Sequence, residues 1–420
     1  MFADFTRYGG KCSCGREHTM VTKAAVIEPG CLKNIEKYMD AYGVDGKRCA
    51  LYGENSYRAV ADRRPKAEQE IVLKAEGLHA NELSTAEVLS RLDEDIEVII
   101  AVGSGTIHDI SRFVAHERGI RFVSCPTAAS VDGFCSTVAA MTWYGFKKTM
   151  AAVAPEIVIA DTDIIKNAPP ELVKSGVGDI MAKYTALCDW KISSLVTGEY
   201  LCEQIYNIMK EATDSVMKSI PGIMKGEDQA YINVTYALLM SGVAMQMMGN
   251  SRPASGAEHH FSHLIEMGPE KLNVRFPALH GEKTGVGSVI ASREYERLAE
   301  IEDIAPFLKP YAAFPEDKLT EFLGARLAPA VLEENTRDCL AAVTPEKLAE
   351  NWQEIRKLIL AMPGSAKLLS LLREMGAKCE PEDIGVSTSD VDTILQYSPM
   401  VRNRLTLMRM RRMISSSAEM

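Results

Sequence analysis

The chain has 420 residues, of which 46% are hydrophobic and 25% are charged, and its formal net charge is −10. A chain of this length forms two domains or one large domain with a substantial core. The acidic balance argues against a nucleic-acid surface, because such a surface needs clustered Lys and Arg to replace counterions along phosphates.

Neither the N-terminus nor the longest apolar stretch suggests a membrane segment. Residues 1–7 lack a basic stretch followed by an apolar run, so they do not resemble a secretory signal. The longest strongly apolar stretch, residues 236–249, is too short to span a bilayer. We therefore expect a protein without a membrane span, located in the cytoplasm.

The ten cysteines are scattered along the chain without a compact framework, which favours reduced thiols over disulfides. Cys12 and Cys14 stand close together and are followed by His18, and all three are residue types that ligate metals. A zinc knuckle would need a second pair of ligands, and the sequence shows none nearby.

The first part of the chain alternates short apolar runs with helical patterns. The runs show little alternation, which is typical of strands buried on both faces. The predicted strands are Val21–Ile27, Cys49–Tyr52, Glu70–Leu73, Val98–Val102, Arg121–Ser124 and Ile157–Ala160. Apolar spacings of three and four predict the helices Cys31–Tyr42, Ser84–Leu92 and Ile107–Arg118. This alternation predicts a parallel α/β sheet with crossover helices.

The strand pattern ends after Asp161, and helical periodicity replaces it. Pro169 and Pro170 mark a linker or a helix start, and long helical patterns cover Glu199–Met217 and Ala230–Met248. We therefore predict an α/β domain over residues 1–162 and an all-α domain over residues 163–420. The basic run from Arg402 to Arg412 is interpreted as the solvated face of the last helix.

A glycine-rich turn follows the predicted strand Val98–Val102 and opens a helix. Its residues are Gly103, Ser104, Gly105, Thr106 and Ile107, and His108 stands where a dinucleotide fingerprint has its third glycine. Glycines let a phosphate approach the backbone, and the helix start offers unpaired amides and a positive dipole end. A tight turn without a ligand is the alternative for this motif alone.

A second loop strengthens the nucleotide interpretation. The next predicted strand leads into Thr127, Ala128, Ala129, Ser130 and Ser136, a loop of small and hydroxyl residues. Open α/β sheets bind ligands at the carboxyl ends of such neighbouring strands.

Four of the eight histidines crowd into residues 259–280, namely His259, His260, His263 and His280. Imidazole is the commonest protein ligand of catalytic metals, and a catalytic site typically has three protein ligands. The best acidic partner upstream is Asp179, which follows two glycines at an expected helix start. Capping of that helix is the alternative role for this carboxylate.

These motifs, in this order, resemble the sn-glycerol-1-phosphate dehydrogenase family, within a larger group that includes glycerol dehydrogenase, iron-containing alcohol dehydrogenases and 3-dehydroquinate synthase. The resemblance covers roughly residues 20 to 300, and the Cys12 to Gly15 start is more similar to the bacterial branch. The motifs that carry it are Gly103 to Thr106, Pro126 to Gly133, Gly176 to Asp179, Ser255 to His263 and Leu279 to Glu282.

The resemblance implies a dinucleotide-binding N-terminal domain and a helical C-terminal domain of the dehydroquinate synthase-like fold. It makes Asp179, His259 and His280 the ligands of one divalent metal, with zinc favoured and nickel or iron as alternatives. It implies that Asp132 and His263 contact the substrate and that Gly103 to Ile107, Thr127 to Ser130 and Ser136 hold NAD or NADP. No role follows for His260, for which a hydrogen-bonded or exposed position is the default.

The choice between NAD and NADP stays open in the sequence. Many relatives place an acid at the end of the second strand to hold the adenosine ribose, but Gly53 occupies that place here and Glu54 follows it. An acid at the ribose favours NAD, and Glu54 is the candidate for that role.

The implied reaction is the reversible reduction of dihydroxyacetone phosphate to sn-glycerol 1-phosphate. The metal would polarise the carbonyl, the nicotinamide would supply the hydride, and a relay including His263 would supply the proton. The phosphate requires cations, and Lys183, Lys271, Arg275 and Lys283 lie near the metal motifs without one being singled out. We also expect a homo-oligomer of unspecified size.

Rival interpretations remain open. On the same scaffold they are oxidation of glycerol or another alcohol, and the lyase chemistry of dehydroquinate synthase. From another class, the rival is a catalytically silent protein that binds a metal and a nucleotide, for which a closed site with His263 as a fourth ligand would speak.

Overall fold

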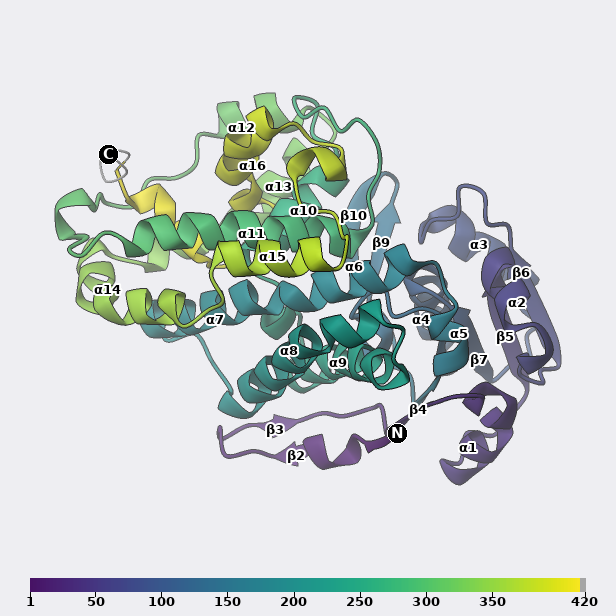
Figure 1. The fold of residues 1–420 in the computed structure, drawn as a ribbon. Coiled ribbons are helices and arrows are strands. Elements are labelled where there is room, and N and C mark those ends of the chain that lie inside the picture. Colours follow the sequence, from purple (N-terminus) through teal and green to yellow (C-terminus); the bar gives the residue numbers. More distant parts are fainter. Residues whose placement is uncertain (416–420) are drawn as a thin grey trace. The chain divides into compact units, whose positions relative to one another are not determined.

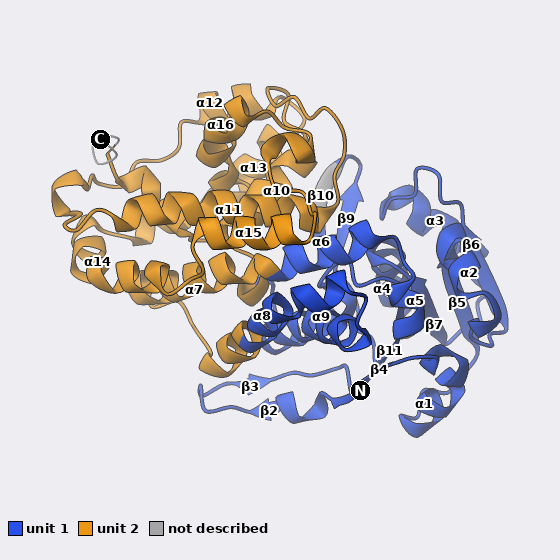
Figure 2. Ribbon diagram, in the orientation of Figure 1, with its two compact units in different colours: residues 1–180, 211–251 blue, residues 181–210, 252–420 orange. Residues whose placement is uncertain are grey.

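The computed structural model describes residues 1–415, which form two compact units (Figures 1 and 2). The first unit comprises residues 1–180 and 211–251, and the second comprises residues 181–210 and the described residues from 252 onward. The predicted division into domains after residue 162 stays a prediction.

A seven-stranded sheet forms the centre of the first unit. Its strand order is β1, β4, β11, β8, β7, β5, β6, in which β1 is antiparallel to β4 and the other neighbours are parallel. The strands are β1 (Phe2–Asp4), β4 (Ala24–Glu28), β5 (Arg48–Gly53), β6 (Gln69–Leu73), β7 (Val98–Gly103), β8 (Arg121–Pro126) and β11 (Ile157–Asp161). All six predicted strands are confirmed, with ends that differ by up to three residues.

Helices cover both faces of this sheet, which explains why its strands are continuously apolar. Val98, Ile100 and Val102 of β7 face one hydrophobic cluster, while Ile99 and Ala101 face another. The first cluster includes residues of α1 (Ile35–Ala41), α2 (Glu54–Val60) and α5 (Thr162–Lys166), and the second includes residues of α3 (Glu82–Arg91) and α4 (Gly105–Arg118). The predicted α/β sheet with crossover helices is therefore confirmed.

Two small antiparallel hairpins were not predicted from the sequence. One joins β9 (Val138–Trp143) to β10 (Phe146–Ala151) through Tyr144 and Gly145, both at positive φ. The other joins β2 (Gly10–Lys11) to β3 (Glu17–His18). Both are short or irregular in pattern, so their pairing depends on what they pack against.

Three long helices follow the sheet: α6 (Pro170–Met181), α8 (Glu203–Met224) and α9 (Asp228–Met248). Helix α6 begins at Pro170, so of the two predictions made for this place, a linker or a helix start, the helix start is confirmed. Proline is well suited to the first turn of a helix. The first residues of α8 belong to the second unit and the rest to the first.

The second unit is helical. Its helices are α7 (Lys183–Thr197), α10 (Ala257–Met267), α11 (His280–Ala299), α12 (Glu316–Leu323), α13 (Ala328–Glu334), α14 (Pro345–Leu360), α15 (Ser365–Glu374), α16 (Val391–Tyr397) and α17 (Leu407–Met410). Within residues 1–415, no strand follows Asp161 apart from a single bridge between Leu308 and Ile414. The predicted change from strands to helices is therefore confirmed.

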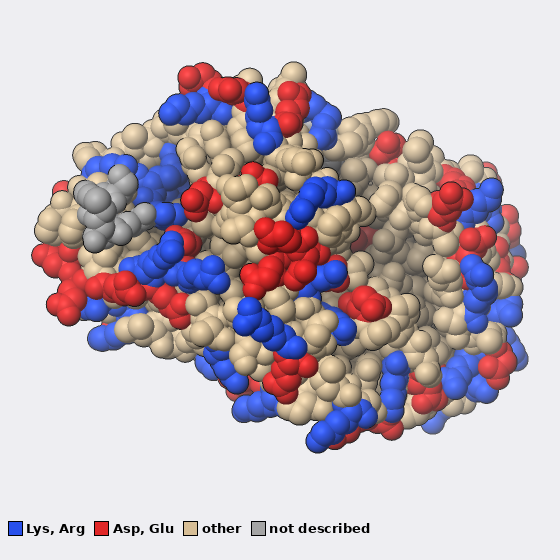
Figure 3. Space-filling view, turned by 45° about the horizontal axis from the view of Figure 1, so that its top comes forward, with Lys and Arg blue, Asp and Glu red and all other residues tan. Residues whose placement is uncertain are grey.

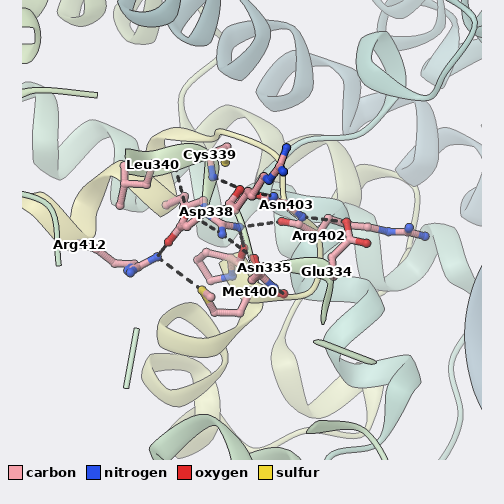
Figure 4. A network of polar contacts seen from close by, with 12 residues as sticks. Glu334, Asn335, Asp338, Cys339, Leu340, Met400, Arg402, Asn403 and Arg412 are labelled. Carbon is pink, nitrogen blue, oxygen red and sulfur yellow. Dashed lines mark hydrogen bonds and ion pairs between the residues drawn. The ribbon is translucent and has the colours of Figure 1, made fainter. Parts of the chain in front are cut away.

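The interpretation of the basic run 402–412 as a solvated helix face is wrong. Helix α17 has only four residues, and Arg409 is fully buried. Its guanidinium bonds to Asp338 and Asn335. Arg412 bonds to the other oxygen of Asp338 (Figure 4). Arg409 and Arg412 thus compensate the charge of a buried carboxylate, and a charge pattern along the chain cannot reveal such a distant partner.

None of the helices described in residues 1–415 has the length and apolar character needed to cross a membrane. On the face drawn in Figure 3, acidic and basic side chains are interspersed.

Candidate functional site

Three loops meet at the carboxyl edge of the sheet in the first unit. Strands β5, β7 and β8 are neighbours, with Tyr52 opposite Val102 and Gly103 opposite Pro126. The Thr127 amide also donates to the Gly103 carbonyl at 2.9 Å. The two loops predicted to hold a dinucleotide therefore lie side by side, and the loop that contains Glu54 lies next to them.

The glycine-rich turn opens helix α4, as predicted. Gly103 ends β7, Ser104 is the N-cap, and α4 begins at Gly105. A Cβ atom on Gly103 would lie 2.6 Å from the Cβ of Ile107, so only glycine lets the first turn of α4 pack this closely on the strand. Ser104, Gly105 and Thr106 are half-buried, which leaves the amides of this turn at the rim of the sheet.

His108 is a structural residue of this helix. Its Nδ1 lies 3.0 Å from the Ser104 carbonyl and its Nε2 lies 2.8 Å from the Ser124 hydroxyl. Burial lowers the pKa of His108 to about 3, so the ring is neutral. The His108 ring occupies the space between α4 and β8, where a glycine would let the helix and the strand pack closer together.

Glu54 begins α2, directly after β5, and is half-buried. Its carboxylate accepts a hydrogen bond of 3.0 Å from the amide of Ala75, which follows β6. The acid is thus held at the same edge of the sheet as the two loops.

Buried residues form the loop after β8. Thr127, Ala128, Ala129, Ser130 and Ser136 are all buried. Arg112 of α4, which the sequence analysis did not identify, is also fully buried and donates to the carbonyls of Phe134, Ser136 and Val138. Burial lowers the pKa of Arg112, although Asp109 opposes that effect. The shape of this loop therefore depends on a cation that lies 24 residues from Ser136.

Asp132 and Asp179 are brought together within the first unit. The amide of Asp132 donates to the Oδ2 atom of Asp179 at 3.0 Å, and the Asp132 carboxylate accepts from the hydroxyl of Ser241 at 2.7 Å. Asp179 is fully buried. One residue predicted to contact the substrate therefore touches one predicted metal ligand, although they are 47 positions apart.

The expectation that Asp179 lies at a helix start is wrong. Asp179 occupies the last turn of α6, where a carboxylate cannot serve as the N-cap. The preceding glycine has another cause, since a Cβ on Gly176 would lie 2.1 Å from the carbonyl oxygen of Ala129. Close packing of α6 on the loop, rather than a turn, requires the glycine.

Three histidines converge in the second unit. His259 and His263 lie one turn apart on α10, and His280 is the first residue of α11. The ring centroids lie 5.3 Å apart for His259 and His280, 5.9 Å for His259 and His263, and 5.7 Å for His263 and His280. Because imidazole is the commonest metal ligand in proteins, three rings this close together favour a metal site.

Glu258 orients His259. Its Oε1 atom accepts from His259 Nδ1 at 2.7 Å, and its Oε2 atom accepts from the Thr185 hydroxyl at 2.5 Å. Burial alone would raise the pKa of Glu258, but these hydrogen bonds and one from the Gly256 amide lower it below its ordinary value. An ionised acceptor requires the proton on Nδ1, which leaves Nε2 of His259 with a lone pair for a metal.

Glu266 plays the same part for His280. Its Oε1 atom lies 2.9 Å from His280 Nδ1 and 3.0 Å from Lys283 Nζ. Ligand atoms of His263, Glu266 and His280 also lie within 4.8 Å of one another. Neither glutamate was predicted to be functional, although the spacing of His259, His263 and Glu266 puts all three on one helix face.

The remaining predicted residues have varied positions. His260 is buried with neither ring nitrogen hydrogen-bonded, so the expectation of a hydrogen-bonded or exposed histidine is wrong. Burial lowers its pKa well below the ordinary value, which keeps it neutral.

Lys183 is fully buried and donates to the Ala254 carbonyl, while Lys271 and Arg275 are exposed. Of the four cations proposed for phosphate, Lys283 shares a carboxylate with His280.

Comparison with known proteins adds to this geometry. A family model described as iron-containing alcohol dehydrogenase matches residues 26–169. A glycerol-1-phosphate dehydrogenase from Geobacillus stearothermophilus, whose name gives NAD(P)+ as its cofactor, is 34% identical over 330 residues, which is 78% of this chain and 75% of that protein. The protein of the same name from Bacillus licheniformis is 30% identical over 94% of this chain and 90% of its own length.

Solved structures share the fold. The structure of a probable glycerol dehydrogenase from Sinorhizobium meliloti matches with a TM-score of 0.59 and 17% identity, covering 89% of this chain and 87% of that one. An archaeal alcohol dehydrogenase from a Red Sea brine pool matches with a TM-score of 0.60 and 13% identity, covering 92% of both chains. At these identities the likeness shows that the chain shares the fold of these dehydrogenases, an α/β domain followed by a helical part as expected from the sequence, and it shows nothing about substrates.

Proposed function

Because the chain belongs to the glycerol-1-phosphate dehydrogenase family, we propose that it interconverts dihydroxyacetone phosphate and sn-glycerol 1-phosphate with NAD(P)(H). It is an oxidoreductase that acts on a secondary alcohol. The relatives support the substrate, and the carboxylate-held pair of His259 and His280 supports the metal chemistry.

We assign Asp179, His259 and His280 as ligands of one divalent metal. The fit rests on the donor set: His259 and His280 each direct Nδ1 at a carboxylate, which is the usual arrangement of a metal-binding histidine. One carboxylate and two imidazoles suit zinc, nickel or iron, with zinc favoured. Such an ion would polarise a carbonyl oxygen and stabilise the developing alkoxide.

Chain connectivity supports the inclusion of Asp179. Lys183, four residues after Asp179, bonds to the carbonyl of Ala254, and Thr185 bonds to Glu258, the neighbour of His259. Four residues span at most roughly 14 Å. The chain that follows Asp179 is therefore anchored to the segment at the start of α10.

Asp132 and His263 are proposed to contact the substrate. Asp132 lies against Asp179, and His263 lies one helical turn from His259, so both positions border the proposed metal. In the reduction, His263 belongs to the relay that delivers a proton to the C2 oxygen, while the nicotinamide, when bound, supplies hydride to C2.

The dinucleotide is proposed to lie across the carboxyl edge of the sheet. The amides of residues 103–107 would face the pyrophosphate, with Thr127 to Ser130 and Ser136 lining the neighbouring loop. We propose that Glu54, whose carboxylate accepts from the Ala75 amide, also accepts a hydrogen bond from a ribose hydroxyl, which would favour NAD over NADP. Cytoplasmic location and homo-oligomeric assembly stay predictions.

One assay tests this function. Purified protein is mixed with dihydroxyacetone phosphate and NADH or NADPH, with and without a chelator, and absorbance and product chirality are followed. We expect oxidation of the nicotinamide, loss of the rate with chelator, and the sn-1-phosphate enantiomer. Turnover of glycerol or dihydroxyacetone instead would favour the alcohol dehydrogenase alternative, and metal and nucleotide binding without turnover would favour a non-catalytic role.

A further inference from the structure

The N-terminal hairpin holds a second cluster of metal-ligand residues, apart from the histidines described above. We propose that Cys12, Cys14 and His18 bind a structural Zn²⁺ ion. The two sulfur atoms and a ring nitrogen of His18 lie within 4.8 Å of one another, and Sγ of Cys14 lies 3.5 Å from Nε2 of His18.

The backbone of this hairpin explains how two cysteines with one residue between them converge. Strands β2 and β3 pair Gly10 with His18, and the Cys12 amide donates to the Arg16 carbonyl at 2.9 Å. The Gly15 amide donates back to the Cys12 carbonyl at 3.0 Å, and Gly15 has φ +85°. A residue with a side chain would be strained there, so Gly15 keeps this turn tight.

The orientation of His18 is the observation that points most directly to a metal. His18 is only 4% exposed, and its Nδ1 atom lies 2.7 Å from the carbonyl oxygen of Met247 in α9. A carbonyl can only accept, so Nδ1 carries the proton and Nε2 keeps its lone pair. That lone pair is on the nitrogen next to Cys14, which is how a metal-ligating histidine is held by its surroundings.

From the sequence alone a zinc knuckle lacked support, because a second ligand pair is missing. His18 supplies a third ligand next to the two cysteines, and all three residues belong to the first unit.

Sulfur and imidazole ligands are typical of structural zinc, whereas the site assigned to Asp179, His259 and His280 has no sulfur. The ion would fasten the N-terminal hairpin to the end of α9, next to which it lies (Figure 1).

Cobalt substitution separates the two sites spectroscopically. Full-length protein is purified under reducing conditions, and its metals are replaced by Co²⁺. We expect a near-ultraviolet thiolate-to-cobalt charge-transfer band and a second metal ion per chain. The double variant C12S/C14S is expected to lose the band and that second ion while keeping the ion at the histidines, and the matched control Cys379→Ser is expected to keep both.

Several results would overturn the proposal. The first is the absence of the thiolate band in the reduced wild-type protein, and the second is an unchanged metal count in C12S/C14S. The third is a disulfide between Cys12 and Cys14, which would be detected because the two thiols react with an alkylating reagent only after reduction. If the double variant does not fold, the wild-type spectrum and metal count still decide.

Discussion

The Oε1 atom of Glu258 accepts a hydrogen bond of 2.7 Å from Nδ1 of His259, and both residues are buried at the start of α10. The two are adjacent in the sequence, and the carboxylate is held in place by two further donors: the Gly256 amide donates to Oε1 and the Thr185 hydroxyl donates to Oε2. The contact determines which nitrogen of His259 is available to a metal.

Replacement of Glu258 by Gln is expected to weaken metal binding without removing a ligand. Loss of an orienting partner typically reduces metal affinity roughly 10- to 100-fold. The measurement is a metal titration monitored by calorimetry, with circular dichroism to verify folding. An affinity equal to that of the wild type would show that Glu258 does not orient a ligand.

Removal of a proposed ligand should have a larger effect. Asp179→Asn, His259→Ala and His280→Ala are each expected to lose the metal and at least about a hundredfold in kcat, since a metal contributes several kcal/mol to transition-state stabilisation. The exposed His116→Ala variant is the control and should retain both. Full metal content together with full activity in the three variants would contradict the assignment.

Gly103→Ala tests the close packing at the glycine-rich turn. Its new Cβ would lie 2.6 Å from the Cβ of Ile107, so we expect the free energy of unfolding to fall by about 2 kcal/mol and nucleotide affinity to fall with it. Gly53→Ala is the matched control, because its Cβ would lie 3.5 Å from the same side chain. Denaturant unfolding compares the two variants, and equal stabilities would refute the packing argument. Nucleotide titration is made on Gly103→Ala against the wild type.

Asp338→Asn probes the buried arginine network of Figure 4. Burial by itself would raise the pKa of Asp338, but Arg409, the Leu340 amide and Arg412 lower it below its ordinary value. Loss of the charge should reduce the free energy of unfolding by about 3 kcal/mol at pH 7.

The pH dependence of this effect has a definite sign. A carboxylate whose pKa is lowered on folding stabilises the protein above about pH 4, and this contribution disappears as pH falls through the folded pKa. The difference between wild type and Asp338→Asn should therefore shrink on acidification. The exposed Asp317→Asn variant should show no such trend in the same unfolding series.

Glu54→Ala examines cofactor choice. A charged hydrogen bond contributes about 1.5–3 kcal/mol, so loss of the carboxylate should lower kcat/KM for NADH about tenfold. The value for NADPH should change less, because the ribose phosphate gains nothing from an acid. An unchanged NADH to NADPH ratio would show that Glu54 does not contact the ribose.

Local patterns predicted those parts of the molecule that local physics controls. The apolar run Val98–Val102 could only be a strand buried on both faces, and the turn from Gly103 into α4 followed from the backbone freedom of glycine. His259 and His263 lie on one helix face because their spacing matches the helical period. Family resemblance then connected these segments to one reaction.

Other features follow from contacts between residues that are distant in the sequence. Asp179 meets Asp132 only because α6 packs on the loop after β8, and Arg409 is buried only because Asp338 lies opposite. The Met247 carbonyl, 229 residues from His18, determines which ring nitrogen of His18 faces Cys14 with a lone pair. Periodicity and propensity describe how one segment folds, but the protonation, burial and orientation of a polar group depend on its neighbours in space, and the folded chain alone brings these together.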